Sequence, residues 1–283
     1  MSVVHLKRWN LSIGAGQPLA VIAGLNVLEN LDLALEVGRT LKAAAANLGL
    51  PYVFKASFDK ANRSSIKSYR GPGLKDGLAM LAEVKRQLDV PIATDIHEID
   101  QAEPVAAVAD LVQIPAFLCR QTDLVTAAAI ATSAQGGILH VKKAQFLAPW
   151  DCKNIVIKAR EAAPDLQIVL CERGSSFGYN NLVVDMLAIG QMQSLGVPVT
   201  IDATHAVQLP GADPRTAGGS TGGRREGVPV IAKAAVAAGA DGVFLEFHPD
   251  PDQALCDAPS CLPLSDAAGL LKTLKALHQA VRT

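Results

Sequence analysis

Five basic residues stand at or just after short apolar runs of this sequence. They are Lys55, Lys60, Arg63, Lys142 and Arg173. Arginine binds carboxylate and phosphate groups through paired hydrogen bonds, whereas lysine binds them as a compact charge. If the fold brings these side chains together, they form a site for one or more strongly anionic small molecules.

Other polar residues that could take part in catalysis follow the same kind of apolar run. They are Asn26, Asp95, His97, Gln113, Lys143, Asp202, His205, Glu246 and His248. Each one alone could be an ordinary loop residue. Chance alone is not expected to place polar or charged residues after every one of the apolar runs. A lysine such as Lys142 could also form a Schiff base, although the adjacent Lys143 suits charge binding equally well.

A glycine-rich loop, Gly218–Gly223, precedes Arg224 and Arg225. It could be a mobile lid or an anion-binding loop, and it could equally be a flexible surface connection. It is not a Walker A motif, because no Gly-Lys-Ser/Thr follows. No strand leads directly into it, as a dinucleotide-binding fingerprint would require.

The elements that position these residues follow a regular alternation. Eight short apolar runs bounded by turn residues are typical of parallel strands buried on both faces. The runs are Leu19–Gly24, Tyr52–Ser57, Ile92–Asp95, Leu111–Ile114, Gly137–Val141, Ile168–Cys171, Val199–Asp202 and Gly242–Glu246. Helical patterns lie between them, most clearly the leucine and valine stripe of Leu74–Leu88. Further helices are predicted over Leu31–Leu48, Gln121–Ser133, Asn181–Leu195, Glu226–Ala238 and Leu264–Val281, with weaker patterns after Glu98 and Asp151.

Eight strands alternating with eight helices predict an α/β fold, a (β/α)8 TIM barrel, although the periodicity is also compatible with an open, doubly wound sheet. Catalytic residues of such barrels lie at the carboxyl ends of the strands, where the polar residues above would meet. We expect a single domain: a short N-terminal extension, residues 1–18, that could form a β-hairpin closing the barrel bottom, and a catalytic barrel over 19–283.

Composition excludes several classes of protein. Of the 283 residues 49% are hydrophobic and 19% charged, which rules out a disordered chain. A net charge of −1 and 4% aromatic residues argue against nucleic-acid and membrane partners. No apolar run is long enough to span a bilayer and no signal-peptide pattern is present, so we expect a cytoplasmic protein. The scattered cysteines are expected to be reduced thiols: Cys119, Cys152, Cys171, Cys256 and Cys261.

Seven segments carry a more specific signal. They are KASFDKANRSSIKSYRGPG (Lys55–Gly73), TDIHE (Thr94–Glu98), QIPAFLCRQTDL (Gln113–Leu124), VKKAQF (Val141–Phe146), ERGSSFGYNNLVVDM (Glu172–Met186), DATHAVQLP (Asp202–Pro210) and EFHPDPDQALCDAPS (Glu246–Ser260). In this order they resemble the 3-deoxy-D-manno-octulosonate 8-phosphate synthase family over nearly the whole chain after about residue 18. KANRSS and AFLCRQTD separate that family from the related 3-deoxy-7-phosphoheptulonate synthases. The resemblance implies a TIM barrel, usually a homotetramer, that condenses phosphoenolpyruvate with D-arabinose 5-phosphate and releases phosphate, a step toward lipopolysaccharide.

The resemblance also implies roles for individual residues. Lys60, Lys142 and Arg173 would hold phosphoenolpyruvate, and Arg120 would reach the site from a neighbouring subunit. Asn62, Arg63 and Ser64 match the residues that bind the pentose phosphate, and Asp95 and Gln208 match contacts to sugar hydroxyls. The predicted substrate-binding set is Lys55, Lys60, Asn62, Arg63, Ser64, Asp95, His97, Gln113, Ala116, Phe117, Arg120, Lys142, Arg173 and Gln208. The predicted catalytic set is Asn26, Lys142, His205, Glu246 and Asp257.

Phosphoenolpyruvate is already an enol ester, so its methylene carbon needs no Schiff base to attack the aldehyde. We therefore expect Lys142 to be a charge clamp and proton donor, with His205 and Asp257 handling the water that adds next. In the metal-dependent branch of the family, a cysteine joins a histidine, a glutamate and an aspartate around a divalent ion. Here Asn26 stands at the cysteine position, and an amide replaces thiolate poorly. The resemblance thus implies the metal-independent branch, without metal or cofactor.

Three other functions stay open at this point. A synthase of the same fold could use another aldehyde, such as erythrose 4-phosphate or an N-acyl hexosamine. A catalytically silent barrel could bind sugar phosphates as a regulator, and a Schiff-base aldolase is the third alternative. One departure from the family pattern is the segment 211–221, which looks longer than the short family loop.

Overall fold

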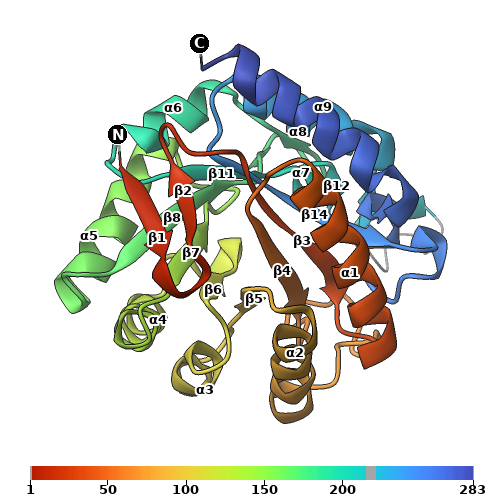
Figure 1. The fold of residues 1–283 in the computed structure, drawn as a ribbon, viewed down its shortest axis with the longest axis horizontal. Coiled ribbons are helices and arrows are strands. Elements are labelled where there is room, and N and C mark those ends of the chain that lie inside the picture. The colour runs from red at the N-terminus through yellow and green to blue at the C-terminus, as the bar shows by residue number, and fades with distance from the viewer. Residues whose placement is uncertain (1, 215–220, 283) are drawn as a thin grey trace.

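The computed structural model describes residues 2–214 and 221–282. Within these residues eight parallel strands form a closed barrel, because β11 pairs with β8 on one side and with β14 on the other (Figure 1). The strands are β3 (Ala20–Val27), β4 (Tyr52–Ser57), β5 (Ile92–Asp95), β6 (Leu111–Ile114), β7 (Ile138–Lys142), β8 (Gln167–Glu172), β11 (Val199–Asp202) and β14 (Gly242–His248). Each overlaps one predicted run, so the predicted (β/α)8 barrel is confirmed and the open sheet is wrong.

Helices surround this barrel in Figure 1. They are α1 (Leu31–Asn47), α2 (Leu74–Leu88), α3 (Ala102–Ala106), α4 (Thr122–Ala134), α5 (Lys153–Ala162), α6 (Leu187–Gln193), α7 (Ala203–Ala206), α8 (Val228–Ala237) and α9 (Ala267–Ala280). The stripe on α2 buries Leu81, Val84 and Leu88 against the strands, as its spacing predicted. In the described residues, no helix is both long enough and apolar enough to cross a membrane.

The predicted helix over Asn181–Leu195 is wrong in its first third. Leu182 and Val183 form the short strand β10 (Leu182–Val183), which pairs with β9 (Ser175–Ser176), and α6 begins only at Leu187. Val183 and Val184 are β-branched and favour extended backbone. Pairing with a segment just upstream therefore overrides the helical pattern here.

The core consists of two layers because neighbouring side chains on a strand point to opposite faces. The larger layer fills the space between the strands and the helices. The smaller one fills the barrel interior with strand residues such as Ile22, Val53 and Phe244. It also includes Leu6 and Ile13, which belong to an antiparallel hairpin of β1 (Val3–Leu6) and β2 (Leu11–Gly14).

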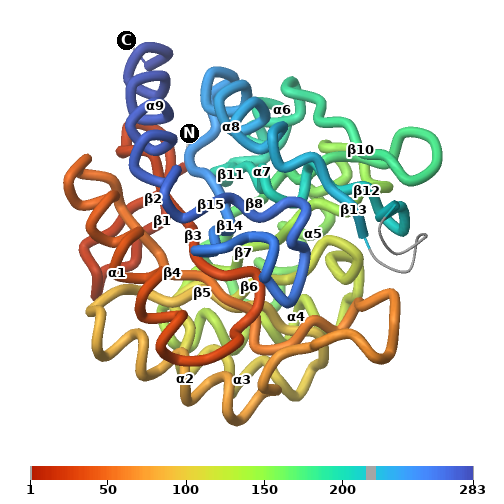
Figure 2. The backbone as a smooth tube through the Cα atoms, turned by 90° about the vertical axis from the view of Figure 1, so that its right-hand side faces the viewer, coloured from red at the N-terminus to blue at the C-terminus, as the bar shows by residue number. Residues whose placement is uncertain are grey.

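This hairpin lies at the amino ends of the strands. Trp9, in its turn, donates from Nε1 to Oδ1 of Asp110 at 2.8 Å, and Asp110 directly precedes β6. Figure 2 shows β1 and β2 on one side of the molecule and the loop after β4 on the other, with β12 (Gln208–Leu209) and β13 (Gly222–Gly223). The carboxyl ends of the strands therefore face a rim built from long loops.

Candidate active site

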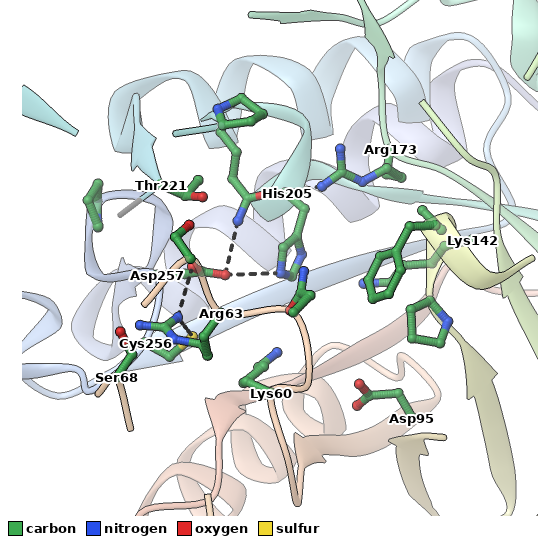
Figure 3. A pocket seen from close by; sticks show the side chains of 18 of the residues that line it. Lys60, Arg63, Ser68, Asp95, Lys142, Arg173, His205, Thr221, Cys256 and Asp257 are labelled. Carbon is green, nitrogen blue, oxygen red and sulfur yellow. Dashed lines mark hydrogen bonds and ion pairs between the residues drawn. The ribbon is translucent and has the colours of Figure 1, made fainter. Parts of the chain in front are cut away.

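A cavity of about 480 Å³ opens among these loops at the carboxyl ends of the strands (Figure 3). Most of the predicted site residues line it: Lys55, Lys60, Asn62, Arg63, Ser64, Asp95, His97, Gln113, Ala116, Phe117, Lys142, Arg173, His205, Gln208 and Asp257. Asn26 and Glu246 lie just beneath it, almost completely buried. Arg120 is exposed and does not line the cavity within this chain, so a contribution across a subunit interface stays a prediction.

Local backbone features hold these side chains at the strand ends. Gly24 of β3 pairs with Lys55 of β4, and a Cβ atom on residue 24 would clash with the Lys55 carbonyl. Asn26 lies within an irregularity of β3 between Gly24 and Val27, and such a bulge re-aims a side chain. The side chain of Asp202 caps α7 by accepting from the backbone N–H of His205 at 2.9 Å, which places His205 one turn beyond the end of β11.

Three of the five cavity cations are paired with carboxylates, so the cluster is not uniformly positive. Lys55 Nζ lies 2.7 Å from Glu246 Oε1, and Lys142 Nζ lies 2.6 Å from Asp202 Oδ2. Arg63 Nη1 lies 3.7 Å from Asp257 Oδ1. Charged groups buried to this degree require such partners, because desolvation costs several kcal/mol per ion.

The other two cations keep hydrogen-bonding capacity for a ligand. Arg173 is 5% exposed, and although its Nη2 donates to Gln208 Oε1 at 2.9 Å, its Nη1 has no partner among the described residues. Burial lowers the pKa of Lys60, but Glu246 and Asp95 outweigh that effect and raise the pKa above its usual value. Lys60 is thus a firmly charged ammonium group on the cavity wall, and both side chains suit an anionic ligand.

At the cavity a polar network joins all five predicted catalytic residues, with Lys142 connected through Asp202. His205 Nδ1 lies 2.8 Å from Asp202 Oδ2, while its Nε2 lies 3.6 Å from both Glu246 Oε2 and Asp257 Oδ2. The amide nitrogen of Asn26 donates to Glu246 and, at 3.2 Å, to Asp257. The opposite orientation of this amide would place its oxygen against two carboxylates, so the network fixes which atom faces them.

The carboxylates of this network are ionised at neutral pH. Burial raises the pKa of Glu246, but Lys55 and His205 more than compensate and lower it to about 2. Burial likewise raises the pKa of Asp257, but His205, Lys60 and Arg63 together outweigh it, so the pKa lies below its usual range. The network therefore holds negative charge directly around the His205 ring.

The sequence placed Asp202 among the polar residues that could take part in catalysis, but neither predicted site set included it. It connects Lys142 to His205. The signal available was the spacing of the Asp202 and His205 pair, three residues apart after a strand, as in a helix cap. His140 was also missed: it lies between Gln113 Oε1 at 3.3 Å and Thr200 Oγ1 at 2.9 Å. Burial, reinforced by Lys142, lowers the pKa of His140 to about 3. Its position two residues before Lys142 put it on the same strand face.

The structure describes only the two ends of the loop between β12 and β13. Of the predicted lid Gly218–Gly223, residues 218–220 lie outside the described residues, as do residues 215–220 of the longer segment 211–221. Thr221 lines the cavity, and Gly222 and Gly223 pair with Leu209 and Gln208. The described end of this loop is thus tied to the strand that carries Gln208.

Fold and site together define a (β/α)8 barrel with a cavity, lined by several basic side chains, at the carboxyl ends of its strands. The family model described as DAHP synthetase I family matches residues 2–283, and the chain belongs to that family. It is 53% identical over 282 residues to the 2-dehydro-3-deoxyphosphooctonate aldolase of Hahella chejuensis, which covers 100% of this chain and 97% of that protein. The protein of the same name from Desulfotalea psychrophila is 53% identical over 272 residues, 96% of this chain and 94% of that one. A third, from Shewanella baltica, is 50% identical over 285 residues, with 100% and 97% covered.

Proposed function

We propose that the protein condenses phosphoenolpyruvate with D-arabinose 5-phosphate to 3-deoxy-D-manno-octulosonate 8-phosphate and phosphate, in lipopolysaccharide biosynthesis. The relatives above match this chain over nearly its full length, and all three are named 2-dehydro-3-deoxyphosphooctonate aldolase. The observation that carries the proposal is the unsatisfied Nη1 of buried Arg173 in the same cavity as Lys60 and Lys142. A buried guanidinium nitrogen without a partner is costly, and an anionic ligand would remove that cost.

The charges of the two substrates match this cavity. One carboxylate and two phosphates bring on the order of four to five negative charges at pH 7. Their meeting in a site poor in water requires several cations nearby. The cavity volume of about 480 Å³ lies in the range of small-molecule sites. In this arrangement Lys60, Lys142 and Arg173 hold phosphoenolpyruvate, while Arg63, at the rim with Asn62 and Ser64, holds the pentose phosphate.

The geometry supports a mechanism without an imine. The methylene carbon of phosphoenolpyruvate attacks the aldehyde carbon, and the aldehyde oxygen takes up a proton from Lys142. Lys142 forms an ion pair with Asp202, and an ammonium group in such a pair has no free electron pair with which to attack a carbonyl carbon. Water then adds to the former enol carbon, with His205 and Asp257 taking its first proton. The resulting hemiketal hydroxyl gives its remaining proton to the departing phosphate as the C–O bond to phosphate breaks and the ketone forms.

We propose that the reaction proceeds without a divalent metal, and that no other cofactor is needed. A metal bound by His205, Glu246 and Asp257 would have to approach the carboxylate oxygens that Asn26 now contacts through its N–H groups. An amide N–H is a donor that repels a cation, so these residues as arranged do not fit a metal. The amide instead supplies positive polarity between two carboxylates.

The remaining proposals concern the assembly and location of the protein. We propose a cytoplasmic homotetramer in which Arg120 reaches the site of a neighbouring subunit, since Arg120 is exposed and lies three residues after Phe117, a half-exposed residue of the cavity lining. Residues 19–283 would be the catalytic unit and 1–18 an extension of it. The alternative with erythrose 4-phosphate is not favoured by the relatives.

Phosphate release tests this function. The protein is incubated with phosphoenolpyruvate and either arabinose 5-phosphate or erythrose 4-phosphate, each with and without EDTA. We expect rapid phosphate release only when arabinose 5-phosphate is the second substrate, and we expect EDTA to leave its rate unchanged. Release only with the tetrose would overturn the proposed substrate, and loss of activity in EDTA restored by manganese or zinc would overturn the metal-independent mechanism.

A further inference from the structure

Behind the cavity wall lies another buried ion pair, which the mechanism above does not use. Lys143 Nζ lies 3.6 Å from Glu172 Oε2, and both side chains are 1% exposed. Each residue directly adjoins a cavity cation, since Lys142 precedes Lys143 and Arg173 follows Glu172. Successive strand residues point to opposite faces, so the pair lies on the outer face of β7 and β8 while the two cations point inward.

Both side chains of the pair also form hydrogen bonds with backbone groups. Glu172 Oε1 accepts from the backbone N–H groups of Arg173 at 3.0 Å and Gly174 at 2.6 Å. Lys143 Nζ donates to the carbonyl oxygens of Ala144 and Leu147, both at 3.2 Å, and to Ser175 Oγ at 3.0 Å. The backbone N–H of Lys143 also donates to the Cys171 carbonyl at 2.8 Å. The loops after β7 and β8 are therefore joined at the point where they leave the barrel.

Stability alone is a weak explanation for this pair. Replacing a buried ion pair by well-packed apolar residues is often neutral or stabilising, and the layer outside these strands is otherwise apolar. Burial raises the pKa of Glu172 even though Lys143 opposes the rise, so the site bears a cost for holding a charge there. The cost of burying this charge is expected where a side chain has to fix the position of the neighbouring backbone.

We propose that Lys143 and Glu172 are positioning residues, a buried clamp that fixes the backbone carrying Lys142 and Arg173 and so sets the orientation of both cations toward phosphoenolpyruvate. This inference rests on the proposed function, because it assigns those cations to that substrate. The clamp predicts a selective defect. Loosening it weakens the binding of phosphoenolpyruvate and leaves the pentose phosphate, held at Arg63 on the opposite rim, nearly unaffected.

Two variants loosen the clamp in different ways. Glu172→Asp keeps the charge but withdraws the carboxylate from the N–H groups of Arg173 and Gly174. The double variant Lys143→Met with Glu172→Leu removes both charges together, which avoids leaving either one buried and unpaired. The matched control is Lys85→Met with Asp110→Leu. Those residues form an ion pair at 2.9 Å, and Asp110 also accepts a backbone N–H, that of Ile92, at 2.9 Å, but at the amino end of the barrel.

The readouts are the KM values of both substrates from phosphate release, and calorimetric binding of phosphoenolpyruvate alone. We expect Glu172→Asp and the clamp double variant to raise the KM and Kd of phosphoenolpyruvate about fivefold or more, with the pentose KM within twofold and the control at parent values. Parent-like phosphoenolpyruvate binding in a folded Glu172→Asp, an equal rise in both KM values, or the same rise in the control would overturn the clamp. If the parent released no phosphate, the proposed function would fall, while the binding measurement would still decide the clamp.

Discussion

The substitution Asp202→Asn separates a structural from a catalytic use of the network under the cavity. Asp202 is completely buried and bridges Lys142, at 2.6 Å, and the ring of His205, at 2.8 Å. Asparagine has the same shape and can still accept the backbone N–H of His205. The change therefore removes one negative charge and leaves the ammonium group of Lys142 without its partner.

The expected losses follow from the burial of this pair. Burial alone would raise the pKa of Asp202, but His205 and Lys142 hold it well below its usual value, so a full charge is removed. Breaking a buried pair on one side costs about 3–5 kcal/mol, which for a chain of this size lowers Tm by roughly 6–20 °C. With Lys142 free to move and His205 no longer held by a carboxylate, we expect kcat to fall at least about 100-fold, or about 2.7 kcal/mol.

The control is Asp241→Asn, which breaks a similar pair at the other end of the barrel. Asp241 is 3% exposed, lies 2.8 Å from Arg282 and accepts the N–H of Val199 at 2.9 Å. Thermal unfolding followed by circular dichroism should show lower Tm values for both variants. Phosphate release, measured well below either Tm, should be lost only in Asp202→Asn. A folded Asp202→Asn that turns over like the control would refute the proposed role of the network.

Three further predictions concern metal binding at the site, the guanidinium group of Arg173 and the stability of the protein in acid. Asn26→Cys should bind one cobalt ion with a thiolate-to-metal absorption band that the parent lacks, because a thiolate then joins three suitable ligands; titration without that band would contradict it. Arg173→Lys should raise the KM of phosphoenolpyruvate about tenfold at unchanged Tm, since lysine cannot bind Gln208 and a phosphate together. Equal KM values for phosphoenolpyruvate in the variant and the parent would contradict this prediction. The pKa of His140 is depressed from 6.5 to about 3, so its contribution to stability is present above pH 6.5 and is lost as pH falls toward 3. Between pH 6.5 and 4.5 the parent should lose on the order of 2–3 kcal/mol of unfolding free energy, and His140→Gln should lose clearly less in urea titrations.

The sequence predicted the barrel well because each strand carries its own local signal. A run such as Val199–Asp202 is apolar, β-branched and bounded by turns, whatever the rest of the chain does. Barrel closure then brings strand ends together, which is why Lys55 and Lys142 could be placed in one cavity. The segment after Asn181 was predicted wrongly because a strand pair with Ser175 and Ser176 depends on chain reversal, which periodicity does not record.

The sequence did not predict which cations of the site pair with which carboxylates, for a related reason. Lys55 and Glu246 are separated by 191 positions, and Lys142 and Asp202 by 60. No local pattern connects them. Each contact depends on the stagger of neighbouring strands and on which face a side chain takes. Residue type predicted that cations gather at the mouth, whereas only the assembled barrel shows which of them are already neutralised.

This pairing bears on how an anion site of this kind works. A cavity that needed only positive charge would bind phosphoenolpyruvate more tightly after Asp202→Asn, because one negative charge has gone. A cavity that works by fixed geometry would bind it more weakly, because Lys142 loses the partner that orients it. The second outcome is expected, since charges held in place before the reaction stabilise a transition state without reorganisation. The carboxylates under the cavity would then assist the reaction of two anions, and the sign of the change in affinity decides between the two views.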